Sequence, residues 1–425
     1  VLGHEVGHCL GMMHNMGASN NVPVEKLRDP AYTQKYGTTP SIMDYARFNY
    51  VAQPGDYERG VRMTPPRFGV YDRYAIKWAY SPILDKTLKE ETAYMSQWIT
   101  DSLCKSPVFR YGKQQFGMPF GDPRSMNEDL GDDAVKATRY GVKNLKYIMA
   151  HMDQWLHGKD TDMSYRASLI DNIVQQYALY TIHVASNVSG YYLNEVKDGD
   201  GQVRLRGLDK ARQKEALNYL FTLYSDLDWM DNKALLGKIA LSGSPKTTIR
   251  QFVRGFILSA PVLVSCYNSI DAKSLQPDEA TRMVYNFVWK PTLAARKLTD
   301  SQKALQKAYV FNLLGNSGFT IPKALASQSL TSVQQHAIHF DRLCSCEEMP
   351  QLQLPQLRDE ATRPVGGFEQ VPREMFSSTP SLTPADMFAT LQQVRSLLKS
   401  HRSSGSSSDR AHYEYLLRII DSCVK

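Results

Sequence analysis

The stretch HEVGHCLGMMH occupies residues 4–14 and decides how the rest of the chain is interpreted. In an α-helix, residues four apart lie on one face, so His4 and His8 can bind one metal ion together. Two imidazoles favour zinc, at about 2.0–2.1 Å from each nitrogen. Glu5 follows the first histidine, where its carboxylate can act as general base toward a water on the metal without binding the metal itself.

The second half of this stretch supplies a third ligand. Gly11 is predicted to end the helix, because glycine adopts positive φ after a helix at little cost. The chain can then turn and bring His14 to the same ion. Three protein ligands leave one position for water, which is typical of a catalytic zinc site. We therefore predict one Zn²⁺ per chain; incidental histidines on a helix are the alternative.

The pattern H-E-x-x-H-x-x-G-x-x-H is similar to the extended zinc motif of the metzincin metallopeptidases. Members of that clan have a Met-turn downstream, whose methionine forms a hydrophobic floor beneath the metal. The segment SIMDY at residues 41–45 matches it, so the resemblance implies this role for Met43. It also implies that Tyr45 binds zinc in the resting enzyme and supports the transition state. A buried tyrosine with a purely structural role is the alternative.

Further segments resemble one family within the clan, namely large bacterial zinc-dependent metallopeptidases with a domain of unknown function at the C-terminus. These segments are residues 41–54, 128–135 and 183–190. The resemblance covers most of the chain and implies a zinc-dependent endopeptidase that acts on proteins or peptides. It also implies export, with a periplasmic, cell-surface or secreted location.

In metzincins, a twisted sheet with its substrate-binding edge strand precedes the zinc helix. The zinc motif here begins at residue 4, so we expect this chain to be a fragment that carries the lower half of a zincin-like catalytic domain without that sheet. We expect such a fragment to be a poor enzyme. We also expect residues 1 to about 50 to be more mobile than the helical body.

Hydrophobic periodicity predicts a mainly α protein with minor β structure. Residues 15–60 are expected to form a loop, and short strands are expected within 104–125. A helix capped by Asp132 or Asp133 is expected to follow. The other predicted helices lie near residues 71–78, 90–98, 162–190, 208–226, 247–260, 277–288, 300–314, 384–400 and 409–422.

Three regions are predicted from these patterns. Residues 1–125 are expected to form the C-terminal part of a metzincin catalytic domain, 126–345 a helical domain, and 346–425 an extended connector with terminal helices.

The sequence DGDG at 198–201 indicates a β-hairpin turn rather than a calcium loop, because Val203 stands where an EF-hand requires glycine.

Other polar residues have a functional and a structural interpretation. Residues just past the Met-turn are candidate walls of the substrate pocket, with ordinary packing as the alternative. An acidic group farther on is interpreted as charge at a helix N-terminus rather than a calcium site. His183 is interpreted as a core residue rather than a ligand. The pocket candidates are Arg47, Phe48, Asn49 and Tyr50, and the acidic group comprises Glu128, Asp129, Asp132 and Asp133.

Composition sets broad limits. The chain has 425 residues, 42% of them apolar, and a formal net charge of +7. No block of Lys and Arg is dense enough to indicate nucleic-acid binding. The longest apolar stretch, residues 256–264, is interrupted by Pro261 and is shorter than the roughly 20 residues of a membrane helix. We therefore expect neither a nucleic-acid partner nor a transmembrane segment in this chain.

The six cysteines form no disulfide framework, and Cys344 and Cys346 lack a second pair at zinc spacing.

Two other functions stay open at this point. In a binding or scaffold protein the zinc site would be inherited but idle, although an idle site has no need of the base that Glu5 supplies. Alternatively, the zinc site could hydrolyse a substrate other than a peptide.

Overall fold

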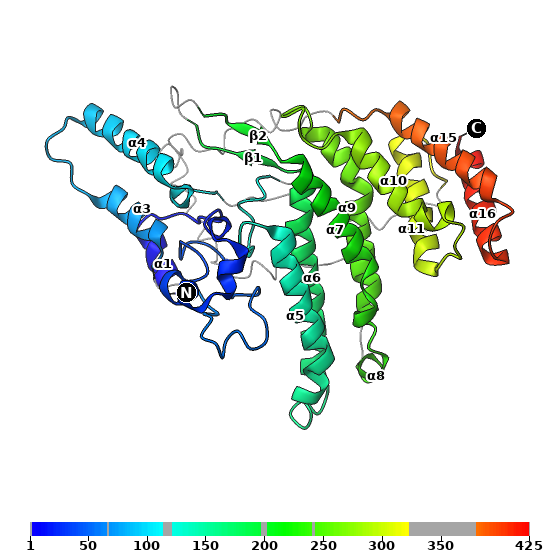
Figure 1. Ribbon diagram of the computed structural model, residues 1–425, viewed down its shortest axis with the longest axis horizontal. Helices are drawn as coiled ribbons and strands as arrows, with labels where there is room; N and C mark the ends of the chain where they lie inside the picture. Colours follow the sequence, from blue (N-terminus) through cyan, green and yellow to red (C-terminus); the bar gives the residue numbers. More distant parts are fainter. Residues whose placement is uncertain are drawn as a thin grey trace, which may run out of the picture. The chain divides into compact units, whose positions relative to one another are not determined.

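The computed structural model describes residues 2–65, 68–113, 121–196, 202–239, 243–322 and 380–424. These residues form mostly α-helices and one two-stranded sheet (Figure 1), which confirms the predicted mainly α class with minor β. The chain divides into two compact units: residues 1–264 with 268–287, and residues 265–267 with 288–425. Neither unit ends at the predicted limits near residues 126 and 346, which stay predictions.

The segment that contains the histidines has short helices joined by long turns. Its elements are α1 (Leu2–Cys9), the 3₁₀ helices η1 (Ser19–Asn21) and η2 (Val24–Arg28), α2 (Pro30–Tyr36), α3 (Val70–Tyr80), α4 (Leu88–Lys105) and the 3₁₀ helix η3 (Pro107–Phe109). The predicted loop at 15–60 therefore contains three short helical elements. The signal for α2 was present, because the Asp29 carboxylate accepts the Tyr32 N–H and Pro30 occupies the first turn.

The predicted strands within 104–125 are wrong for the part of that segment that the structure describes. Residues 104–113 and 121–125 contain the end of α4 and η3, and none of them lies in a strand. Ser106 begins η3 by accepting the Val108 N–H, with Pro107 following it. Serine followed by proline favours such a helical turn over a strand.

Three long helices pack side by side in the same unit (Figure 1): α5 (Ala134–Trp155), α6 (Ser164–Ser189) and α7 (Lys210–Ser225). Asp133 caps α5 by accepting the Lys136 N–H, as predicted. The residues expected on its apolar face, Val135, Val142, Leu145 and Met149, are all buried. They pack because they recur at helical spacing on one side of α5.

A hairpin follows α6, as the sequence predicts. Strand β1 (Tyr191–Leu193) pairs antiparallel with β2 (Leu205–Gly207), and Tyr192 lies opposite Arg206. Residues 197–201, which include the whole predicted turn at 198–201, lie outside the described residues.

The next elements are the 3₁₀ helix η4 (Asp228–Met230), α8 (Lys233–Leu236), α9 (Pro245–Tyr267) and α10 (Pro277–Leu293). Helix α9 continues past Pro261, where the sequence predicted its end. Among the described residues it is the one helix long and apolar enough to cross a membrane, but 56% of its most apolar window is buried in the protein. A helix in a protein core passes the same test, so α9 does not show a membrane-spanning segment.

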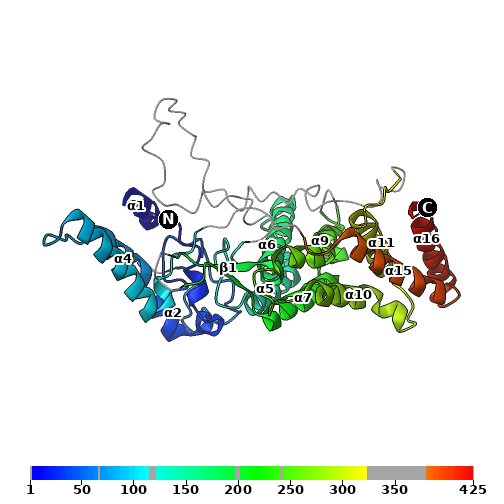
Figure 2. The same ribbon diagram turned by 90° about the horizontal axis from the view of Figure 1, so that it is seen from above.

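The second unit contains α11 (Asp300–Asn316), α15 (Pro384–His401) and α16 (Ser407–Cys423), which pack on one another (Figure 2). Each begins with a capping box, in which a Ser or Thr and the residue three positions later bind each other's backbone N–H. Leucines of all three helices, among them Leu314, Leu391 and Leu416, are buried. Cys344, Cys346 and the predicted connector up to residue 379 lie outside the described residues.

Candidate metal centre

The three predicted ligands converge. His4 and His8 lie one turn apart on the same face of α1, and the turn after α1 brings His14 to them. The Nε2 atom of His8 lies 3.2 Å from the Nε2 atom of His4 and 3.0 Å from that of His14. Among the described residues, this is the one group of three or more His, Cys, Asp or Glu residues close enough to hold a metal ion.

Hydrogen bonds on the other ring nitrogens show which nitrogen faces the metal position. Nδ1 of His4 lies 2.6 Å from the Ile42 carbonyl oxygen, and Nδ1 of His8 lies 2.9 Å from that of Met12. A carbonyl only accepts, so each Nδ1 carries the proton and each neutral ring presents a lone pair at Nε2. This arrangement orients metal-binding histidines.

The spacing of the Nε2 atoms fits zinc. Two lone pairs about 3 Å apart repel each other unless a cation lies between them. Tetrahedral zinc with bonds of about 2.0–2.1 Å places its nitrogen ligands about 3.3–3.4 Å apart. The distances of 3.2 Å and 3.0 Å from His8 to its neighbours are close to this value. The donor set therefore fits a zinc ion.

The turn after α1 has the hydrogen bonds of a Schellman motif. The Met12 N–H donates to the Gly7 carbonyl, and the Gly11 N–H donates to the His8 carbonyl. Gly11 has a φ of +79°, as this motif requires. Gly11 therefore lies at the end of α1, where the sequence placed it. The same turn places the Met12 carbonyl where it accepts the Nδ1 proton of His8.

The Met-turn passes directly beneath α1. Met43 is fully buried, and a Cβ atom at Gly7 would overlap its sulfur. The Met43 carbonyl accepts the N–H of Asn15, the residue after the third histidine. Met43 therefore packs against α1 at Gly7, and its role as a floor beneath the metal stays a prediction.

Tyr45 reaches the cluster from the Met-turn. Its hydroxyl lies 3.0 Å from Nε2 of His14, and the two ring centroids are 4.6 Å apart. The guanidinium of Arg47 lies 5.7 Å from the centre of the Tyr45 ring. The phenol hydroxyl thus faces the same point as the three imidazoles.

A family model described as Met-zincin matches residues 1–314. The chain belongs to the Met-zincin family. A search of curated proteins and a search of solved structures find no match to it. Zinc binding is thereby supported twice in this Met-zincin, by the family and by the His4, His8 and His14 cluster.

Glu5 follows His4 on α1 of this Met-zincin, and its side chain is exposed. Helix geometry turns it about 100° away from the histidine face. The carboxylate is open to solvent. The role of Glu5 as a base stays a prediction.

The four candidates for the substrate pocket divide into two pairs. Arg47 and Phe48 are exposed, so both stay candidates. Asn49 is buried, and its amide donates to the carbonyls of Leu27 and Arg62. Asn49 therefore has an ordinary packing role, which is the alternative that the sequence left open.

Tyr50 is the second buried member of this group. Its hydroxyl accepts the Leu130 N–H, and its ring lies against that of Tyr180 at 4.8 Å. With only 6% of its surface exposed, Tyr50 offers a substrate almost nothing to contact. It joins the loop that follows the Met-turn to the long helices, which is again a packing role.

The acidic group near residue 130 binds protein groups, but only one of its members caps a helix. Asp133 caps α5, whereas the Asp132 carboxylate accepts the Val24 N–H. Glu128 pairs with Arg47 at 3.2 Å, and Asp129 accepts the hydroxyl of Ser19. The interpretation as charge at a helix N-terminus thus holds for Asp133 alone, because the other three carboxylates bind residues in loops that are distant in sequence.

Two polar residues beside the site were missed by sequence reasoning. Asp44, between Met43 and Tyr45, is buried and accepts the N–H of Ser19 at 2.7 Å. Burial raises the pKa of Asp44 to about 7. Burial, and then the nearby Asp44 carboxylate, raise the pKa of Asp129. Asn15 is fully buried, and its side chain joins the third histidine's loop to the backbone of residues 110 and 112. Asn15 follows His14 and Asp44 follows Met43 in the sequence, and this position could have identified both residues.

His183 is a core residue, as interpreted from the sequence. It is buried, and its Nε2 atom lies 2.8 Å from the Asn127 carbonyl. Burial lowers the pKa of His183 to about 4. It lies in none of the metal clusters that the described residues form.

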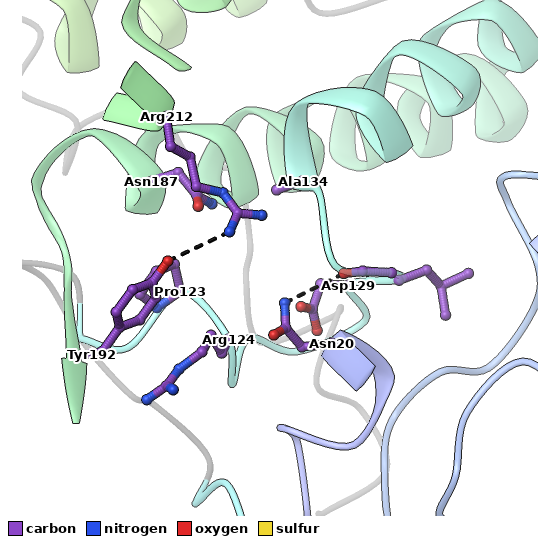
Figure 3. A pocket seen from close by; sticks show the side chains of 10 residues that line it. Asn20, Pro123, Arg124, Asp129, Ala134, Asn187, Tyr192 and Arg212 are labelled. Carbon is purple, nitrogen blue, oxygen red and sulfur yellow. Dashed lines mark hydrogen bonds between the residues drawn. The ribbon is translucent and has the colours of Figure 1, made fainter. Parts of the chain in front are cut away.

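A recess elsewhere in the same unit lacks the histidines and Glu5 (Figure 3). Its charged side chains have partners: Arg124 pairs with Asp122 at 2.6 Å, and Arg212 donates to the Tyr192 hydroxyl at 3.4 Å. The arrangement suited to hydrolytic chemistry is therefore the histidine cluster and not this recess.

Proposed function

We propose that this Met-zincin is a zinc-dependent endopeptidase that hydrolyses protein or peptide substrates. The observation that carries the proposal is the convergence of three Nε2 atoms from His4, His8 and His14 beside a carboxylate that is not a ligand, Glu5. When bound, zinc supplies a Lewis acid that activates water and polarises the scissile carbonyl.

Glu5 is assigned the proton transfers. It accepts a proton from the attacking water as the water oxygen bonds to the scissile carbonyl carbon. It then donates that proton to the amide nitrogen as the C–N bond breaks, which yields a carboxylic acid and an amine. An exposed carboxylate next to His4 is free to meet both water and substrate.

Tyr45 is assigned to the oxyanion. Its hydroxyl lies 3.0 Å from Nε2 of His14, so it approaches the metal position in the resting state. When a substrate carbonyl arrives, the phenol moves away and donates a hydrogen bond to the oxygen that becomes negative. A bond made only in the transition state accelerates the chemical step without tightening substrate binding.

The proposal is tested with the full chain. Elemental analysis of protein purified without added metal should find one zinc per chain. Cleavage of an unstructured, fluorescently labelled protein should be measured with and without a chelator, beside the Glu5→Ala variant. Chelator-sensitive cleavage that Glu5→Ala lacks is the expected result. Stoichiometric zinc with no cleavage of any peptide would instead favour a scaffold with an idle site.

We propose further that the protein is exported. The support is the resemblance to exported bacterial metallopeptidases. Fractionation of cells that express the natural gene, with the protein detected by antibody, tests this location. Detection in the cytoplasm alone would contradict it.

A further inference from the structure

A buried carboxylate lies behind the Met-turn. Asp72, in the first turn of α3, is 2% exposed. Its Oδ1 atom accepts the hydroxyl of Ser41 at 2.6 Å, and its Oδ2 atom accepts the N–H of Ile42 at 3.0 Å. Oδ2 also accepts the N–H of Gly69, the residue that caps α3, at 2.6 Å. Asp72 thus joins the start of α3 to the Met-turn.

The contact continues from Asp72 to the metal centre through one peptide group. Ser41 donates its hydroxyl proton to Asp72 and accepts the Met43 N–H at 3.1 Å. That N–H belongs to the same peptide group as the Ile42 carbonyl, which accepts the Nδ1 proton of His4 at 2.6 Å.

Carboxylate, hydroxyl, amide and imidazole therefore form one continuous chain of hydrogen bonds. Every donor in it points away from the imidazole, toward the carboxylate. Such chains polarise their members cooperatively in a medium of low dielectric. Ser41 is fully buried, so water does not compete with its two bonds.

We propose that Asp72 and Ser41 are positioning residues that set the zinc affinity of His4. The inference rests on the proposed function, because it assumes that His4 binds zinc. Metal-binding histidines commonly donate their second N–H to a carboxylate, which fixes the ring and raises its basicity. Here a peptide group and a serine hydroxyl stand between His4 and the carboxylate. The relay lowers the freedom of the His4 ring and increases the electron density at its Nε2 atom.

Ser41→Ala is the sharpest test. It removes the hydroxyl link but leaves both bonds from the backbone to Asp72 Oδ2 in place, so the start of α3 is retained. Zinc affinity should fall about 10–100-fold, the usual cost of losing an outer-shell partner. Affinity is measured by competition with a chromophoric chelator, at a temperature where the variant is folded. Melting temperature is recorded on the same samples without metal.

Asp72→Asn is the second variant and decides the matter if Ser41→Ala does not fold. Its amide oxygen still accepts the N–H groups of Ile42 and Gly69, but the negative charge at the end of the relay is gone. Zinc affinity should again fall at least about tenfold. Glu90→Ala is the matched control, since Glu90 occupies the same capping-box position in α4 and is exposed.

The outcomes separate the inference from the proposed function. If the parent binds zinc and both relay variants bind it more weakly while Glu90→Ala does not, the relay is supported. If the relay variants melt at lower temperature but bind zinc as the parent does, Asp72 and Ser41 only stabilise the fold and the inference is wrong. If the parent itself binds no zinc, the proposed function fails and the inference fails with it.

Discussion

The sulfur of Met43 occupies the space where a side chain on Gly7 would begin. Gly7 lies between His4 and His8, and its lack of a side chain lets α1 approach the Met-turn this closely. The same approach brings the Ile42 carbonyl to His4. The glycine inside H-E-V-G-H thus sets the distance between the zinc helix and its floor.

Gly7→Ala is therefore expected to push α1 away from the Met-turn. Overpacking of this kind costs about 1–3 kcal/mol of unfolding free energy, and zinc affinity should fall with it. Gly3→Ala in the same helix is the control, because its Cβ would lie 3.5 Å from Ile42, an ordinary contact. Urea denaturation and zinc competition on both variants check this. If both variants have the same unfolding free energy and the same zinc affinity, the close approach of Gly7 to Met43 contributes to neither.

His8→Ala should abolish stoichiometric zinc binding. His8 is the central ligand, with its Nε2 atom 3.2 Å and 3.0 Å from those of the other two histidines. Its loss leaves two ligands and an incomplete tetrahedron. Elemental analysis of the variant is compared with that of His157→Ala, which changes an exposed histidine outside the cluster. A His8 variant that retained one zinc would show that the site is assigned wrongly.

Glu5→Ala should keep its zinc and lose peptidase activity. General acid–base groups contribute roughly 10²–10⁴-fold, so kcat should fall by a factor in that range. Glu91→Ala, at a half-buried position in the first turn of α4, controls for loss of one carboxylate outside the site. Activity of Glu5→Ala within threefold of the parent would remove Glu5 from the mechanism.

Tyr45→Phe should lower kcat with little change in KM. Loss of one oxyanion donor costs roughly 10²–10³-fold, and the ring that packs near His14 is retained. If Tyr45 had only a structural role, the melting temperature would fall and kcat of the folded protein would stay near that of the parent. Both quantities are measured on the same variant, beside Tyr147→Phe on the exposed side of α5.

Asp44 should make the stability of the zinc-free protein depend on pH. Its pKa is raised by burial from the usual 3.8 to about 7 in the folded state. Folding therefore favours the protonated form, so this contribution is complete below about pH 4 and is lost as pH rises through about 7. Asp44→Asn, which is neutral throughout, should lose less stability than the parent between pH 5 and 8. Urea denaturation after removal of metal measures both, and parallel curves would contradict the assignment.

Most helices from residue 134 onward were predictable because their start signals are local. Asp133, Thr299, Thr383 and Ser406 each cap a helix within a few residues of its predicted start. The prediction failed where tertiary contacts outweigh local preference. Helix α9 continues through Pro261 because its neighbours Ala260 and Val264 are buried, and packing of an apolar face offsets the cost of one missing backbone bond.

The substrate-pocket candidates are a second case in which the sequence does not predict which residues are buried. Asn49 and Tyr50 follow the Met-turn in sequence just as Arg47 and Phe48 do. Only the fold decides that two of the four are buried and bonded to Leu27 and Leu130, since no periodic pattern in a loop tells which side chains point inward.

The sequence by itself determined which three histidines converge. Helical spacing places His4 and His8 on one face, and Gly11 ends the helix so that His14 can turn back toward them. All of this depends on residues within eleven positions. What supports the ligands was decided by tertiary structure alone. The Ile42 carbonyl on His4 and the Asp72 carboxylate on Ser41 join residues 38 and 31 positions apart. Hydrogen bonds over such separations leave no spacing in the sequence, because they depend on where the folded chain brings two loops together.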